Sequence, residues 1–166
     1  MKFDQIKLLY EYNYWANWRI LTACAQLSPE QYIASATFGS VRATLIHIVS
    51  SEWGWRSLLQ GSTWPEDLTE ADLPTLDALR ERWHAEQREM MAYIGRLSDE
   101  DLNGIIRYLI STGTVRERVL WHCLLHLVNH GTQHRSEASA LLTSYGQSPG
   151  DVDFTLFLNE HFSLPA

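Results

Sequence analysis

Residues 121–142, WHCLLHLVNHGTQHRSEASALL, contain four of the chain's seven histidines, at positions 122, 126, 130 and 134. This spacing indicates a helix, because side chains four residues apart are neighbours on a helical surface. We expect the helix to begin at Thr114, where TVRE (residues 114–117) matches a capping box, and to end near Tyr145, before Gly146 and Pro149. The stretch therefore predicts the last of several long helices.

Helical periodicity predicts three long helices upstream, over residues 3–27, 41–60 and 75–97. Ser28-Pro29 has the pattern of an N-cap followed by an N1 proline and starts a short turn, and Ser40 is a credible N-cap after a loop through Phe38. Residues 105–110, IIRYLI, fit either a strand or an extended loop, and residues 153–161 fit a last short helix. The chain is expected to be all-α, a single four-helix-bundle domain over residues 1–166 with short additional helices.

Composition and charge exclude several classes of protein. The net charge is −7 and no basic cluster is visible, which argues against nucleic acid as a partner. No apolar run is long enough to cross a membrane, and the N-terminal residues are too polar for a signal peptide. Two cysteines, Cys24 and Cys123, fit a reducing compartment. We therefore expect a cytoplasmic protein.

The four histidines of residues 121–142 cannot all bind one ion. Four residues advance a helix by about 6 Å and about 40°, so His122 and His134 are separated by roughly 18 Å. One ion can contact two neighbours, which leaves the pairs 122/126, 126/130 and 130/134. Any such pair is half of a metal site, and another part of the chain must supply the remaining ligands.

The remaining histidines differ in how well they could complete such a site. His84 has Arg80 and Arg88 four residues away on either side, which indicates a solvated face, and His161 lies near a terminus. His47 lies in an amphipathic helix among small residues that leave room above its ring. These neighbours are Ala43, Thr44, Ser51 and Gly54.

The neighbours of His134 are also small, because Gly131 and Ala138 flank it. A glycine inside a helix costs about 1 kcal/mol relative to alanine, so Gly131 is expected to serve close packing or access. These neighbours favour a site of His130, His134 and His47. The same spacing is equally compatible with hydrogen-bonded histidines of a helical core.

Two familiar metal motifs do not fit the sequence. A zincin needs glutamate directly after the first histidine, but Gly131 follows His130. A di-iron bundle needs two Glu-x-x-His motifs, and only Glu81 and His84 provide one, in a very polar stretch.

Two segments together resemble the DinB family, the DinB/YfiT-like metalloenzyme superfamily. HLVNHGTQHRSEASALL (126–142) is similar to the family's Asn-His-x-x-x-His-Arg-Gly stretch, and TLIHIVSSEWGW (44–55) to its His-Ile helix with downstream Glu and Trp. YNYWAN (12–17) and DVDFTLFL (151–158) add to the resemblance, which touches nearly the whole chain. One departure is Ser136, which stands where the family often has glycine.

The resemblance implies a four-helix bundle in which His47, His130 and His134 bind a divalent metal ion. Zinc is our first expectation and nickel the second, since imidazole suits both. Three imidazoles leave an open coordination position, as catalytic sites do. His122 and His126 are then additional, as core residues or residues beside the ligands.

Characterised relatives include transferases and isomerases that use low-molecular-weight thiols. The resemblance therefore implies an enzyme that activates a thiol or water for attack on a small electrophilic substrate, and a homodimer. The alternatives are a non-catalytic metal-binding, small-ligand-binding or stress-response protein, and a metal-free helical interaction domain.

Side chains near the three histidines suggest further roles. Glu52, five residues after His47, and Glu137, three after His134, could each orient a ligand imidazole or be solvated or helix-pairing carboxylates. Four aromatic residues could wall a pocket or belong to the core, namely Tyr14, Trp18, Trp53 and Trp55.

Overall fold

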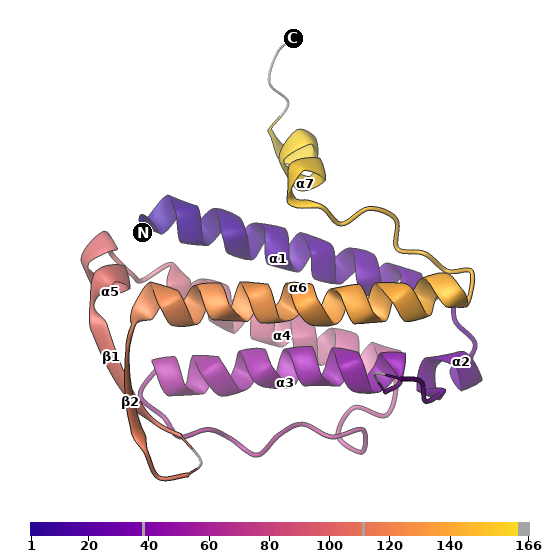
Figure 1. Ribbon diagram of the computed structural model, residues 1–166, viewed down its shortest axis with the longest axis horizontal. Coiled ribbons are helices and arrows are strands. Elements are labelled where there is room, and N and C mark those ends of the chain that lie inside the picture. The colour runs from indigo at the N-terminus through magenta and orange to yellow at the C-terminus, as the bar shows by residue number, and fades with distance from the viewer. Residues whose placement is uncertain (38, 111, 163–166) are drawn as a thin grey trace.

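The computed structural model describes residues 1–37, 39–110 and 112–162, and four long helices form its body (Figure 1). These helices are α1 (Phe3–Cys24), α3 (Val41–Leu59), α4 (Leu76–Ile94) and α6 (Leu120–Ser144). α6 packs against both α1 and α3, and α4 packs against the same two helices. The predicted all-α bundle is confirmed. Phe38, which belongs to the loop expected before Ser40, lies outside the described residues.

The predicted helix starts at Ser28 and Ser40 are confirmed by their capping bonds. The Ser28 hydroxyl accepts a hydrogen bond from the Gln31 amide and begins the short helix α2 (Pro29–Ile33). The Ser40 hydroxyl accepts one from the Ala43 amide at the start of α3. These bonds satisfy amide groups that the helix itself leaves without a partner. The last short helix, α7 (Phe154–His161), also lies where the sequence predicts it.

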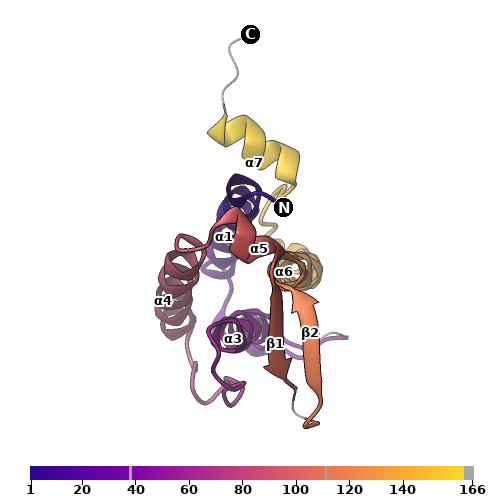
Figure 2. The ribbon, with the colours of Figure 1, turned by 90° about the vertical axis from the view of Figure 1, so that its left-hand side faces the viewer.

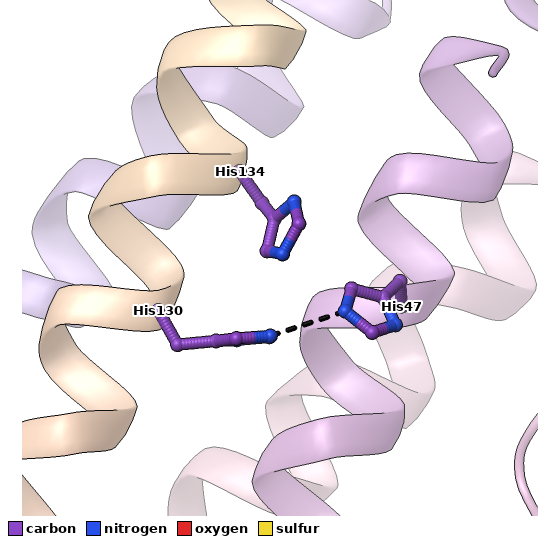
Figure 3. A group of neighbouring side chains, drawn as sticks. All are labelled: His47, His130 and His134. Carbon is purple, nitrogen blue, oxygen red and sulfur yellow. Dashed lines mark hydrogen bonds between the residues drawn. The ribbon is translucent and has the colours of Figure 1, made fainter. Parts of the chain in front are cut away.

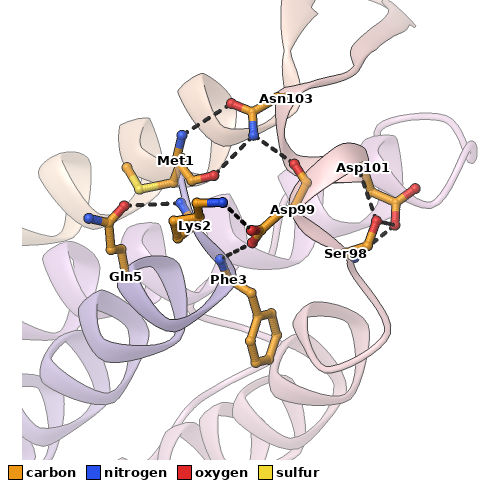
Figure 4. A network of polar contacts seen from close by, with 8 residues as sticks. All are labelled: Met1, Lys2, Phe3, Gln5, Ser98, Asp99, Asp101 and Asn103. Carbon is orange, nitrogen blue, oxygen red and sulfur yellow. Dashed lines mark hydrogen bonds and ion pairs between the residues drawn. The ribbon is translucent and has the colours of Figure 1, made fainter.

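A short helix that the sequence analysis did not predict, α5 (Asp99–Asn103), ties down the N-terminus (Figure 4). Its Asp99 carboxylate accepts a hydrogen bond from the Phe3 amide at 2.7 Å and pairs with the Lys2 ammonium at 2.8 Å. Asn103 accepts from the Met1 ammonium group and donates to the Met1 carbonyl. The first turn of α1 is thereby fixed to the segment that leads into the strand β1 (Ile105–Leu109).

The expectation that the last long helix begins at Thr114 is wrong. Residues Val115–Val119 form strand β2, which pairs antiparallel with β1 (Ile105–Leu109), and α6 begins only at Leu120. The β-branched valines favour a strand, and β1 supplies the backbone partners. Glu117 does not reach back to cap a helix, because its carboxylate lies 2.6 Å from Arg107 Nε across the strands. Of the two alternatives for residues 105–110, the strand is confirmed, and the hairpin lies beside α3 and α6 (Figure 2).

A buried guanidinium group links α6 to α1 in the middle of the bundle. Arg135 is 1% exposed, and its Nη1 donates to Asn13 Oδ1 at 2.5 Å and to Asn17 Oδ1 at 2.8 Å. Its Nη2 donates to Thr132 Oγ1 at 2.9 Å. Asn13 in turn donates through Nδ2 to Glu52 Oε1 on α3 at 3.0 Å. One chain of hydrogen bonds therefore joins three of the four long helices.

Gly131 allows α1 to approach α6 closely at this point. A Cβ atom at position 131 would lie 2.9 Å from Asn13 Oδ1 and 2.8 Å from Arg135 Nη1. Both separations are too short, and both atoms are held by their mutual hydrogen bond. Of the two roles expected for Gly131, close packing and access, the geometry supports close packing.

The helices are not suited to span a bilayer. Among the described residues, no helix combines the length and the apolar character that a membrane crossing requires.

Burial of Glu52 predicts a pH dependence of stability. Burial, with the charge of Glu86, raises the pKa of this carboxyl from 4.5 to about 7, although the Asn13 bond and Arg135 oppose the rise. Between these two pH values the folded protein holds the proton more tightly than the unfolded chain does. The folded state therefore loses stability as the pH rises from 4.5 to about 7, by about 3 kcal/mol in all.

Glu52→Gln should remove this dependence. In urea unfolding of metal-free protein, the free energy of unfolding of the wild type should fall relative to the variant between pH 4.5 and 8 and be level above that. The exposed Glu81→Gln serves as a control and should run parallel to the wild type. Parallel profiles for Glu52→Gln would contradict the shifted pKa.

Candidate metal centre

Three histidines from two helices converge on one point at the surface of the bundle (Figure 3). His47 comes from α3, and His130 and His134 come from consecutive turns of α6. One ring nitrogen of each lies within 4.8 Å of one ring nitrogen of the others. His47 Nε2 and His130 Nε2 are 3.1 Å apart. His47 is exposed and the other two are half-buried, so the cluster is open to solvent on one side.

The structure selects one pair from the four histidines of α6. His122 and His126 are both exposed and neither belongs to the three-histidine group, so a core role for them is excluded. The His122 ring packs edge-on against Trp121, and the His126 ring lies 5.9 Å from that of His130.

The two remaining histidines lie away from the cluster. His84 is exposed on α4, as expected, with its ring stacked on Trp18 at 3.8 Å. His161 lies on α7 against Phe157.

Two imidazoles of the cluster have lowered pKa values. Desolvation of the half-buried His130 ring, together with the positive charges that His134 and His47 would carry, lowers its pKa to about 4. Partial desolvation between its neighbours also lowers the pKa of His47, with His134 adding to the effect and Asp67 and Glu137 opposing it. Neutral imidazoles are the form that binds metal ions, because the ring nitrogen then offers its lone pair.

One of the two carboxylates considered from the sequence contacts the cluster. Glu137 Oε2 lies 2.7 Å from His134 Nδ1, so that nitrogen carries the proton and Nε2 is left with a free lone pair. Glu52 instead belongs to the buried network with Asn13 and is 2% exposed. The sequence left the roles of both carboxylates open because each lies about one helical turn from a histidine. Only their burial in the fold distinguishes the two.

The donor set fits a divalent metal ion. Nitrogen donors lie about 2.0–2.1 Å from zinc, which places two donors roughly 3.3 Å apart across a tetrahedral angle. The 3.1 Å between His47 and His130 is close to that separation. Whether the three histidines bind a metal ion stays a prediction.

The space beside the cluster is a groove of about 340 Å³ between α3 and the loop that follows it. Asp67 lines this groove together with His47, and sequence reasoning did not single it out. The only signal was the acidic composition of residues 62–74, which does not indicate which carboxylate turns toward α3.

Of the four aromatic residues considered as pocket walls, only Trp55 lies near the cluster, with its ring against that of His126. Tyr14 is 2% exposed in the core, Trp18 stacks on His84, and Trp53 lies under Arg82.

Comparison with known proteins identifies the family of the chain. The model of the DinB family matches residues 2–161. Protein DinB of Bacillus subtilis (strain 168) is 30% identical over 162 residues, which cover 90% of this chain and 91% of that relative. The match runs through α1, α3 and α6, which carry the buried network and the three histidines. The chain belongs to the DinB family.

Proposed function

We propose that this protein is a metal-dependent enzyme in which His47, His130 and His134 hold one divalent ion. The observation that carries the proposal is the convergence of three imidazoles at an open surface, two of them with lowered pKa values. Closed structural sites take four protein ligands, whereas three ligands with access from solvent are typical of catalytic sites. Zinc is the first candidate for the ion and nickel the second.

The reaction that we propose is transfer of a low-molecular-weight thiol to a small electrophilic substrate. The ion, when bound, would lower the pKa of a thiol or of water at its open position. The Glu137 carboxylate accepts a hydrogen bond from His134 Nδ1, and this bond keeps Nε2 of the ring directed at the centre. The segment between His130 and His134 offers no carboxylate as a general base. A thiol that is already ionised needs none, which favours thiol transfer over hydrolysis.

The proposal includes a homodimer, as the family resemblance implies, and a cytoplasmic location, which is the expectation from the polar N-terminal residues and the two cysteines. The competing function is a non-catalytic metal-binding, small-ligand-binding or stress-response protein. The open groove of about 340 Å³ beside His47 favours an enzyme, because a storage site needs no room for a second reactant.

Metal content of purified, untagged protein tests the ligand set. We expect roughly one ion per chain in the wild type, measured by elemental analysis after dialysis, because three imidazoles form one site. His47→Ala, His130→Ala and His134→Ala should each lose it. His122→Ala and His126→Ala are matched controls from the same helix and should keep the ion. Retention of stoichiometric metal in all five variants would refute the assignment.

Glu137→Gln tests the hydrogen bond to His134. The amide accepts this bond more weakly than a carboxylate, so zinc affinity should fall about 10- to 100-fold while the protein stays folded. Competition with a chromophoric chelator measures the affinity. Glu81→Gln, on the exposed face of α4, should bind zinc as the wild type does. Equal affinities for Glu137→Gln and wild type would show that Glu137 does not position the imidazole.

Turnover tests the proposed reaction itself. Zinc- and nickel-loaded protein is mixed with cysteine, glutathione or coenzyme A and with 1-chloro-2,4-dinitrobenzene, whose arylation is followed by absorbance. A C–S bond forms as the C–Cl bond breaks, chloride leaves, and the thiol proton goes to the buffer. We expect a rate above background with at least one thiol, and loss of that rate on chelation and in His130→Ala. A rate unchanged by chelation would exclude the metal-dependent mechanism.

A further inference from the structure

A second hollow, of about 440 Å³, lies next to the metal centre and has a very different lining. Its walls come from α3, from the loop after α3 and from β1. Six of the seven lining residues are aromatic or aliphatic, and the seventh is an acid: Trp55, Leu58, Trp64, Asp67, Tyr108, Leu109 and Ile110. Its volume falls in the range of small-molecule sites, about 300–1,000 Å³, and a mostly apolar lining is typical of them.

Two other aromatic rings of this hollow are arranged around that of Trp55. Trp64 meets Trp55 edge to face, with ring centroids 6.2 Å apart and planes at 79°. Tyr108 does the same from β1, at 5.4 Å and 68°. Aromatic pairs prefer such edge-to-face geometry, so the three rings support one another as a preformed box.

Trp64 is held in place from two sides although it belongs to a loop. Its ring lies directly on Gly54, where a Cβ atom would come within 2.4 Å of it. Its indole Nε1 donates to Asp67 Oδ1 at 3.0 Å. The absence of a side chain at position 54 thus creates the seat for the ring. Gly54 serves this aromatic box, whereas the sequence suggested room above His47.

The aromatic box adjoins the three histidines at two points. Asp67 lines both this hollow and the groove that contains His47. On the other side, the Trp55 ring packs against His126 at 5.3 Å, and His126 is the neighbour of His130. A larger hollow of about 530 Å³, beside Trp15, contains none of the three histidines and offers no such link.

The charges around the box favour an uncharged occupant over an organic cation. Asp67 already accepts the Trp64 indole hydrogen, and the Ser50 hydroxyl lies 3.5 Å from the same oxygen. Arg116 is the cross-strand partner of Tyr108 in the hairpin, and Arg118 lies two residues further along β2, so both stand on the same face of the hairpin as Tyr108. An ammonium group would therefore meet two positive charges against the single negative charge of Asp67, one of whose oxygens already accepts a hydrogen bond.

We propose that the box of Trp55, Trp64 and Tyr108 binds a planar, uncharged aromatic group of the electrophilic substrate, beside the three histidines. This inference rests on the proposed function and adds a substrate class to it. The reactive part of one small molecule would then lie at the three histidines, and the part that only binds would lie in the aromatic box.

Binding of 2-naphthylmethanol to zinc-loaded, full-length protein tests the proposal by ligand-observed NMR titration. The comparison ligands are cyclohexylmethanol, which is apolar but not planar, and benzyltrimethylammonium, which is aromatic but cationic. We expect the naphthyl compound to bind more tightly than either. Trp55→Ala and Tyr108→Ala should each weaken it about fivefold or more, and Trp55→Phe should weaken it less. Tyr108 stands on the hairpin outside the helical core, so its variant remains informative if Trp55→Ala does not fold.

Trp15→Ala is the matched control, because Trp15 lines the separate hollow beside α1. It should change the dissociation constant less than about twofold. Equal weakening in Trp15→Ala and Tyr108→Ala, or preference for the ammonium compound, would overturn the proposal.

The same titration on metal-free His130→Ala separates this inference from the proposed function. Naphthyl binding in that variant supports the box even if the wild type holds no metal. Conversely, Tyr108→Ala that keeps its zinc and binds the naphthyl compound as tightly as the wild type refutes the box and leaves the metal site standing.

Discussion

The structure depends on the burial of one charge, the guanidinium of Arg135. A charged group that is 1% exposed must find its hydrogen-bond partners within the protein, and Asn13, Asn17 and Thr132 supply them. Leaving a buried polar group without its hydrogen-bond partner typically costs about 1–3 kcal/mol, and more for a charged group, so the relative position of α1 and α6 is strongly constrained. The hydrogen bond from Asn13 to Glu52 extends the same constraint to α3.

The same network of hydrogen bonds also fixes the relative positions of the three histidines. His134 directly precedes Arg135, and His47 lies on the helix that carries Glu52, so the network fixes the register of α6 against α3 at the level of the site. Successive helix residues point about 100° apart. Arg135 and Gly131 therefore face α1 while His134 and His130 face the edge of α3. Rigid helices hold both ligand-bearing faces, which suits a site whose donors must lie within about 0.5 Å of the productive geometry.

The features that could be predicted from the sequence are local or follow from helical spacing. Ser28 and Ser40 cap helices because their hydroxyls reach amides three residues away. His130 and His134 share a face because side chains four residues apart are neighbours on a helix.

The start of α6 could not be predicted, since TVRE matches a capping box and only the distant β1 makes Val115–Val119 a strand. The choice between Glu52 and Glu137 also needed the fold, because a carboxylate near a histidine in sequence can still point into the core. Three of the four segments that carry the family resemblance contribute Asn13, Asn17, Glu52 and Arg135, and their meeting in one network is visible only in three dimensions.

The site is thus divided between two kinds of structure. The helical bundle supplies the histidines, and it is held by a buried polar network that tolerates little change. The aromatic box takes Trp64 from a loop and Tyr108 from a two-stranded hairpin, neither of which contributes to that network. Changes in the loop and hairpin can therefore alter the hollow without moving the imidazoles, because Trp64 rests on Gly54 and Asp67 and not on a ligand. In such an arrangement the proposed metal chemistry would be fixed by the fold, and the choice of substrate would be free to differ between proteins that share the three histidines.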